Sequence, residues 1–260
     1  MTKKIAIIGC GTMGSGIAKR LSKKHSLFLY DRNAKKVESL VKIGHGTACS
    51  SLSDAFHHSD ILILAIKPQG IQEFGASIAK IPLKHTIISL LVGTTTLELK
   101  TYFPGQQIVR MMPNLALLCG EGAIGLCKES SLPSSEVDNI ESICAELGKG
   151  YWIPESKFNA FSALAGSGIA FIFALIEAMV ESGIAMGLSA EESQEMIQQT
   201  IKGGLHLLQK SKKHPAELKW QVTSPGGTTI AGLQKFEEAA VKAGIMNTFL
   251  ATYQRSIELS

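Results

Sequence analysis

The chain has 260 residues, of which 45% are hydrophobic and 18% are charged, a composition ordinary for a globular protein of one large or two modest domains. Its net charge of +4 comes from scattered or paired lysines, so nucleic-acid binding is not expected. Five cysteines without a C-x-x-C pair indicate neither a disulfide framework nor a zinc site and favour a reducing cytoplasm. No signal-peptide pattern is present, and the most apolar stretch, 163–176, is too short to span a bilayer, so we expect no membrane anchor.

The N-terminus has the pattern of a strand, a glycine-rich turn and a helix. An isoleucine-rich strand over residues 4–8 is followed by a helical pattern over residues 15–23. In such a turn the first glycine makes the bend, the second lets a pyrophosphate reach the backbone, and the third lets helix and strand pack closely. The predicted dinucleotide-binding residues are Ile8, Gly9, Cys10, Gly11, Thr12, Met13 and Gly14.

The second strand, over residues 27–30, ends in a pair of residues with opposite implications for the cofactor. Asp31 would accept a hydrogen bond from a free ribose 2′-hydroxyl and repel a 2′-phosphate. Arg32, helped by Asn33 and Lys36, could instead pair with that phosphate, or it could be a solvated loop residue. The choice between NADH and NADPH therefore stays open.

Strands and helices then alternate, which predicts a parallel, doubly wound sheet. The expected strands are 47–49, 61–66, 86–91, 107–111, 123–126 and 151–153, and the expected helices are 35–41, 53–58, 97–102 and 134–147. Ligands bind at the carboxyl ends of strands in open sheets. The residues at two strand ends are therefore candidate cofactor contacts: Ala65, Ile66, Lys67, Pro68, Pro113 and Asn114. The alternatives are a proline that only ends its strand and an asparagine that only completes a turn.

From residue 157 onward only helical patterns are found, at 163–186, 190–210, 216–221, 229–243 and 245–258. We therefore predict a dinucleotide-binding domain over residues 1–156 and a helical dimerisation and substrate-binding domain over residues 157–260. The 163–186 segment is apolar nearly all round, which favours burial against a partner subunit over a central helix of a monomer.

A turn over residues 222–229 precedes the helical pattern that continues toward Ala243. Pro225 fixes its own φ, while Gly226 and Gly227 allow a ligand to approach the main chain. The following helix begins with free N–H groups and the positive end of its dipole, which favours a small anion such as a carboxylate. Ser224, Thr228 and Thr229 add hydroxyls. The alternative is an ordinary N-capped helix start.

Two other kinds of chemistry are not indicated. Ser167 does not lie in a G-x-S-x-G elbow, because Ala165 and Ile169 occupy the flanking glycine positions. The histidines include no H-E-x-x-H; His57 and His58 are expected at an exposed helix end, and His214 before Pro215 at a helix start. No metal site is predicted.

In order along the chain, these motifs resemble those of the pyrroline-5-carboxylate reductase family. The matching stretches are the Gly9 turn, 65–68, 110–114, 166–168, 214–219 and, most specifically, 222–229. The resemblance implies an N-terminal Rossmann domain, a C-terminal helical domain that interlocks into homodimers, frequently five to a decamer, and reduction of 1-pyrroline-5-carboxylate to L-proline by NAD(P)H. It also favours NADPH mildly over NADH.

Given that resemblance, we assign the substrate carboxylate to the Ser224 hydroxyl and to the N–H groups of Gly227 and Thr228, and we count Gly226 among the substrate-binding residues. The Thr229 hydroxyl is assigned to the ring nitrogen and is the predicted catalytic group. The nicotinamide is expected near Lys67 and Asn114. Positioning should dominate catalysis, because a protonated imine accepts a hydride without a strong protein acid.

The sequence departs from the family pattern at Ala116, Ala165, Ile169, Phe171, Lys212 and Trp220. Two rivals have other signatures. A β-hydroxyacid dehydrogenase would be expected to carry a lysine on the long central helix, and none lies between Lys157 and Lys202. A non-catalytic dinucleotide-binding sensor could keep the Gly9 turn but would not need the loop from Ser224 to Thr229.

Overall fold

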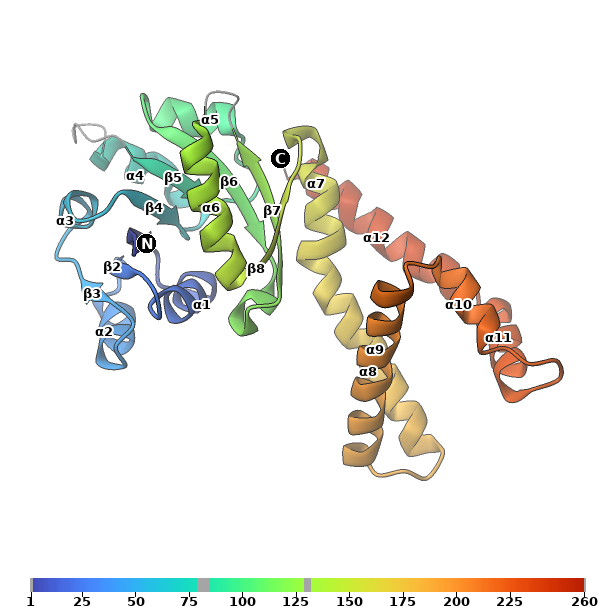
Figure 1. The fold of residues 1–260 in the computed structure, drawn as a ribbon. Coiled ribbons are helices and arrows are strands. Elements are labelled where there is room, and N and C mark those ends of the chain that lie inside the picture. The colour runs from blue at the N-terminus through green and yellow to red at the C-terminus, as the bar shows by residue number, and fades with distance from the viewer. Residues whose placement is uncertain (1, 79–84, 129–131, 260) are drawn as a thin grey trace. The chain divides into compact units, whose positions relative to one another are not determined.

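The computed structural model describes residues 2–78, 85–128 and 132–259. The chain divides into two compact units, one formed by residues 1–167 with 253–260 and the other by residues 168–252 (Figure 1). The expected functional domains, 1–156 and 157–260, are a different division and stay a prediction.

The first unit is organised around one sheet. Among the described residues it has eight strands in the order β3-β2-β1-β4-β5-β6-β7-β8. Their bounds are β1 Lys4–Ile8, β2 Ser26–Tyr30, β3 Thr47–Ala48, β4 Ile61–Leu64, β5 Thr86–Ser89, β6 Gln107–Pro113, β7 Gly122–Lys128 and β8 Gly148–Trp152. The strand order changes direction at β1 and β4, the position where open sheets of this type bind ligands.

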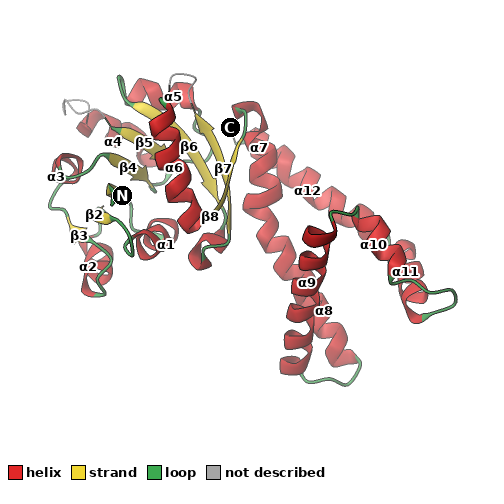
Figure 2. Cartoon of the chain, viewed as in Figure 1, coloured by secondary structure: helices red, strands yellow, loops and turns green. Residues whose placement is uncertain are grey.

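Helices cover both faces of this sheet (Figure 2). They are α1 Thr12–Leu21, α2 Ala34–Lys42, α3 Leu52–His57, α4 Ile71–Ile78, α5 Thr96–Tyr102 and α6 Ser134–Leu147. Successive strand residues point to opposite faces, so Ile5 and Ile7 pack with α1, α2 and α6, whereas Ala6 and Ile8 pack with α3, α4 and α5. The doubly wound fold is confirmed.

The expectation of a wholly parallel sheet is wrong at one edge. Strands β1 to β6 pair in parallel, but β7 pairs antiparallel with β6, with Met111 opposite Leu126. Only the short turn η2, Leu115–Cys119, connects these two strands. A parallel pair needs a crossover of a dozen or more residues, so this connection permits only the antiparallel arrangement.

The rest of the chain is helical: η3 Glu155–Lys157, α7 Phe158–Phe161, the π-helical segment η4 Ser162–Ser167, α8 Gly168–Ala185, α9 Ala190–Ser211, α10 Pro215–Gln221, α11 Thr228–Glu238 and α12 Val241–Glu258. The expected helix over 229–243 is wrong in extent. It ends at Glu238, because Ala240 takes a left-handed conformation with φ of 51°. The next helix begins at Val241 rather than at Ile245.

In the second unit α8 packs against α9 at a close crossing. A Cβ on Gly183 would lie 2.3 Å from the Ser193 hydroxyl oxygen, so only glycine permits this approach. Much of α8 is nevertheless exposed in the single chain, including Phe173, Met179 and Ile184. The helical run over residues 155–185 extends beyond the expected apolar stretch 163–176 at both ends and is long and apolar enough to cross a membrane by length and composition alone. Only 11% of the 18-residue apolar part of this run is buried in the single chain.

Candidate functional site

The glycine-rich turn joins β1 to α1 and depends on two glycines for different reasons. Gly9 has a φ of 99°, and a Cβ there would lie 2.5 Å from the carbonyl oxygen of Ala65. A Cβ on Gly14 would lie 1.8 Å from the carbonyl oxygen of Gly9. A Cβ on Gly11 would meet only open space. The turn is therefore closely packed against the end of β4 and open at the position predicted to face the pyrophosphate.

Helix α1 begins with free donors. Its N-cap is Gly11, no side chain caps it, and its first turn contains no acidic residue. The N–H groups of Thr12, Met13 and Gly14 have no intrahelical acceptor, because they occupy the first helical positions. With the positive end of the helix dipole, they form an anion site that fits a pyrophosphate.

The Asp31 carboxylate ties the end of β2 to this turn. One of its oxygens accepts the Cys10 N–H at 2.7 Å, and the other accepts the Asn33 N–H at 2.8 Å. A carboxylate has further acceptor sites, so Asp31 can still bind a ribose hydroxyl. Burial and the nearby Asp31 raise the pKa of the Cys10 thiol to about 12, so this cysteine stays protonated.

Arg32 lies at the surface beside a carboxylate that the sequence did not indicate. Its guanidinium is 3.4 Å from Glu73 on α4, and both side chains are about four-fifths exposed. Asn33 accepts the Lys35 N–H and caps α2. Capping uses the side-chain oxygen of Asn33, and the expected help from Asn33 in binding a phosphate stays a prediction.

The residues after β4 border the glycine turn. The Ala65 N–H donates to the Ile8 carbonyl oxygen at 2.8 Å, and Ile66 packs beside Gly9. Lys67 is exposed and precedes the short turn η1, Pro68–Gly70. This strand end is thus a wall of the candidate cofactor site as well as the end of a strand.

Asn114 follows β6 and is buried, with 8% of its surface exposed. Its side-chain oxygen accepts the Ala123 N–H, and its side-chain N–H donates to the carbonyl oxygen of Ala165, both at 3.1 Å. The two sequence-based alternatives were a nicotinamide contact and a turn residue. In the structure the amide bridges β7 and η4, and its contact with the nicotinamide stays a prediction. Pro113 pairs with Ile124 where β6 meets β7.

The Ser224 to Thr229 loop leads into α11. Gly226 has a left-handed φ of 67°, which favours glycine. The Gly227 N–H donates to the Ser224 carbonyl oxygen at 3.1 Å, closing the turn. This N–H is therefore used inside the loop and is not the free carboxylate donor that we assigned from the sequence.

The free donors lie one residue further on. Gly227 is the N-cap of α11, and within this fully described loop no side chain caps the helix. The N–H groups of Thr228, Thr229 and Ile230 occupy the first helical positions, without intrahelical acceptors. Ser224 and Thr228 are exposed and Thr229 is half-buried. An uncapped helix start with hydroxyls nearby differs from the ordinary N-capped alternative.

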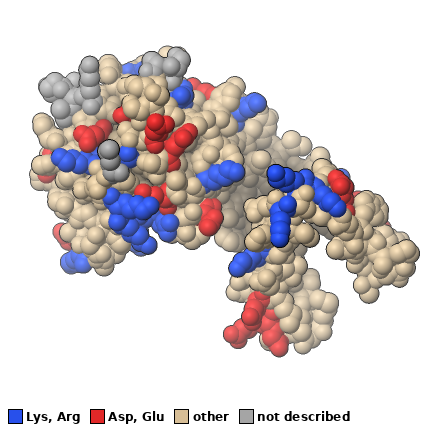
Figure 3. All heavy atoms as spheres, in the orientation of Figure 1, with Lys and Arg blue, Asp and Glu red and all other residues tan. Residues whose placement is uncertain are grey.

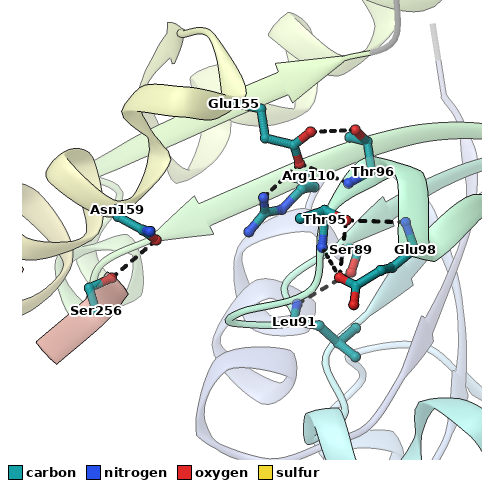
Figure 4. Close-up of polar contacts among 9 residues, drawn as sticks. All are labelled: Ser89, Leu91, Thr95, Thr96, Glu98, Arg110, Glu155, Asn159 and Ser256. Atoms are coloured by element: carbon teal, nitrogen blue, oxygen red, sulfur yellow. Dashed lines mark hydrogen bonds and ion pairs between the residues drawn. The ribbon is translucent and has the colours of Figure 1, made fainter. Parts of the chain in front are cut away.

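A partly buried charged cluster was not identified from the sequence (Figure 4). Arg110, with 6% of its side chain exposed, donates to Glu155 at 2.7 Å and stacks 4.3 Å from the centre of the Phe158 ring. Glu155 also accepts the N–H and the hydroxyl of Thr96, at 2.8 Å and 2.6 Å. Burial opposes the charge of Glu155, but its bonds to Thr96 and Arg110 outweigh that effect and lower its pKa. The only available signal was an arginine inside an apolar strand.

The other expectations about sites can be compared with the described residues. His57 and His58 lie exposed at the end of α3, and the His214 side chain caps α10, as predicted. Within the described ranges no group of three or more His, Cys, Asp and Glu residues could hold a metal. Figure 3 shows basic and acidic side chains intermixed over the first unit on the face drawn.

Comparisons with known proteins agree with this arrangement. A family model for pyrroline-5-carboxylate reductase dimerisation matches residues 155–259, and one for a coenzyme F420-dependent NADP oxidoreductase matches residues 4–93. Pyrroline-5-carboxylate reductase from Aquifex aeolicus is 32% identical over 100% of this chain and 98% of its own length. Pyrroline-5-carboxylate reductase 2 from Bacillus subtilis is 30% identical over 99% of this chain and 95% of its own.

Solved structures show the same fold. The reductase from Streptococcus pyogenes superposes with a TM-score of 0.88 at 28% identity, covering 98% of each chain. The Plasmodium falciparum enzyme, solved with NADP bound, has a TM-score of 0.87 at 27% identity and covers 99% of this chain and 98% of its own. The Rossmann-like sheet followed by helices is therefore shared with these proteins.

Proposed function

Since the chain belongs to the pyrroline-5-carboxylate reductase family, we propose that it reduces 1-pyrroline-5-carboxylate to L-proline, with NAD(P)H as the hydride donor. The imine carbon gains the hydride and the ring nitrogen keeps a proton, which balances the reaction. The observation that carries this proposal for the chain's own residues is the uncapped start of α11 beside the Ser224, Thr228 and Thr229 hydroxyls.

The cofactor site is the turn from Gly9 to Gly14 with the start of α1. Its free N–H groups and the absence of an acidic residue in the first turn suit a pyrophosphate. Asp31 suits the ribose, and Ala65 to Pro68 line the adjoining strand end. Both NADH and NADPH are expected to work, with a mild preference for NADPH, because Arg32 can turn from Glu73 to a 2′-phosphate.

The substrate carboxylate binds the Ser224 hydroxyl and the backbone N–H groups of Thr228 and Thr229. The Gly227 N–H is replaced in this role because it bonds to Ser224 within the loop. The Thr229 hydroxyl aligns the ring nitrogen. These groups bind and orient the substrate, and no side chain is required to supply a strong acid.

The working form is a homodimer. The dimerisation segment of the family covers residues 155–259, and α8 exposes Phe173, Met179 and Ile184 in the single chain. A partner subunit would cover this face and remove it from water. We expect a cytoplasmic protein. We also expect five dimers to assemble into a decamer, which a measurement of the molar mass in solution tests.

The purified chain should oxidise NAD(P)H when 1-pyrroline-5-carboxylate is added, with L-proline as the product. The loss of reduced-nicotinamide absorbance and the amount of proline formed should agree one to one. L-Proline should compete with the substrate, whereas prolinamide should not, because the start of α11 recognises an anion. NAD(P)H binding without turnover would contradict the proposal and indicate a sensor, and equal inhibition by acid and amide would contradict the carboxylate assignment.

A further inference from the structure

The helical run after β8 contains one wide turn. Segment η4, Ser162–Ser167, is π-helical, whereas α7 before it and α8 after it are regular. In a π-turn the N–H groups bond to carbonyls five residues earlier rather than four, and such turns are rare and frequent at functional sites. A contact from outside the helix can favour this wide form over a regular helix.

Asn114 makes that contact. Its side-chain N–H donates to the Ala165 carbonyl oxygen at 3.1 Å. In a regular α-helix this oxygen would accept the N–H of the residue four positions later, Ile169. By supplying another donor, Asn114 lowers the cost of losing that helical bond at this carbonyl.

The Asn114 side chain is itself held firmly. Its oxygen accepts the Ala123 N–H at 3.1 Å, and the Asn114 N–H donates to the Ala123 carbonyl oxygen at 3.2 Å. A buried amide that makes both bonds has one orientation, since exchanging its oxygen and nitrogen would lose both. The donor that faces Ala165 therefore cannot turn away without cost.

The beginning of the wide turn is anchored separately. The Phe161 ring lies so close to β7 that a Cβ on Gly125 would be 2.6 Å from it, and Phe158 is buried beneath Arg110. These contacts fix α7 on the sheet regardless of Asn114. The Asn114 bond therefore acts on the later part of the turn, from Ala165 to Ser167.

This anchor lies at the edge of the sheet that carries the cofactor turn. Asn114 follows β6, and the parallel strands β1 to β6 end at the same edge. The next segment, η2, packs on α1 so closely that a Cβ on Gly16 would lie 2.3 Å from Leu118. A change in the turn at Ala165 would therefore act on Asn114, the residue that directly precedes the segment packed on α1.

We propose that Asn114 is a positioning residue that keeps η4 in its wide form and thereby sets the peptide groups from Ala165 to Ser167 for the reduction. The catalytic part of this inference rests on the proposed function, whereas the effect on the turn does not. Without Asn114, the Ala165 carbonyl would bond to the Ile169 N–H, and the segment would tighten into a regular helix.

The test combines Asn114→Ala with Ile169→Pro. Proline has no N–H and its ring clashes with the carbonyl four residues earlier, which here is Ala165. Proline at position 169 therefore disfavours the tight form by a route independent of Asn114. We expect Asn114→Ala to lower kcat about tenfold, equivalent to about 1.4 kcal/mol, with little change in KM. Adding Ile169→Pro should restore most of this loss.

Asn139→Ala is the matched control. Asn139 lies on α6, where it accepts a hydrogen bond from Lys3 and donates one to Glu136. The Asn139→Ala variant also removes a side-chain amide that makes two hydrogen bonds, but far along the chain from the wide turn, so kcat should stay unchanged. A wild-type kcat in Asn114→Ala, or a loss that proline fails to restore although Ile169→Pro alone is active, would overturn the proposal.

A crystal structure of Asn114→Ala shows whether Asn114 keeps η4 in its wide form, even if the proline variants do not fold. A regular helix over residues 162–167 is the expected result, and an unchanged wide turn would overturn the inference. This measurement needs no turnover, so it separates a failure of this inference from a failure of the proposed reaction.

Discussion

The two anion-binding helix starts of this protein, α1 and α11, share a design but differ in what holds them. Both have a glycine N-cap, no side-chain cap and no acidic residue in the first turn. The turn before α1 is enclosed, with Gly9 and Gly14 in contact with backbone atoms of the sheet edge and of the turn itself. The loop before α11 is exposed at Ser224, Gly226 and Thr228 in the single chain.

This difference shows two ways of organising the same backbone donors. Packing fixes the first site, because any side chain added at Gly14 would meet a carbonyl oxygen. The second depends on local bonds, namely the left-handed Gly226 and the bond from Gly227 to Ser224. Substitutions of the packed glycines before and in α1 should therefore affect stability together with binding, whereas substitutions in the loop before α11 should affect kinetics alone.

The largest effect is expected for Gly14→Ala. Its Cβ would lie 1.8 Å from the Gly9 carbonyl oxygen, and such overpacking costs about 3 kcal/mol, so both the melting temperature and NAD(P)H affinity should fall. Gly11→Ala is the matched control for stability, since its Cβ meets open space. It should weaken cofactor binding at an unchanged melting temperature. Titration calorimetry and thermal unfolding of the apo proteins test this pair, and equal stability of the two variants would contradict enclosure by packing.

Thr229→Val tests whether the α11 loop acts in the reaction. The change keeps the shape and removes one hydroxyl hydrogen bond to a charged partner, worth about 1.5–3 kcal/mol, or roughly 10- to 100-fold in kcat/KM. NAD(P)H affinity and thermal stability should be nearly unchanged. Thr223→Val is the control, because the Thr223 hydroxyl donates to the Lys219 carbonyl oxygen at the end of α10. If Thr229→Val loses melting temperature and keeps normal turnover, Thr229 is structural.

Ser224→Ala should raise the KM for 1-pyrroline-5-carboxylate about tenfold while changing kcat little, for the loss of one hydrogen bond to a carboxylate. The backbone donors at the start of α11 remain, so binding should weaken without being abolished. Steady-state kinetics with the substrate varied at saturating NAD(P)H measure this effect. An unaltered KM would mean that backbone N–H groups alone hold the carboxylate.

A smaller effect is expected for the exposed pair of Arg32 and Glu73. Arg32→Ala should lower kcat/KM for NADPH roughly fivefold relative to NADH, because an exposed charge contact is screened by water. Glu73→Gln should shift the ratio the other way by releasing Arg32 for the 2′-phosphate. Identical ratios in all three proteins would show that Arg32 is only a loop residue.

The smallest effect concerns acid stability at Glu155. Its pKa in the folded protein lies below the usual 4.5, so its ionised form stabilises the fold at neutral pH, and that stabilisation disappears as the pH falls through the lowered folded value. Glu155→Gln should therefore reduce the melting temperature at pH 7 and flatten its decrease between about pH 5 and about pH 3. Thermal unfolding across that range measures it. Parallel curves for wild type and variant would remove Glu155 from the acid response.

The local motifs could be derived from the residues alone. The strand over 4–8, the helix over 134–147, the start of α10 at His214 and Pro215, and both glycine-containing turns were predicted close to where they lie. Each depends on neighbours in the sequence: apolar periodicity, capping residues, and the freedom of glycine. The break at Ala240 was missed because no glycine or proline marks it.

Long-range pairing was decided only by the tertiary structure. The bonds from Asn114 to Ala165, from Cys10 to Asp31 and from Arg110 to Glu155 join residues that are 51, 21 and 45 positions apart. The wide turn η4 also depends on what packs against it. A side chain's local pattern specifies which bonds it can make, whereas the packing of distant elements decides which partner lies within reach and excludes water from the bond.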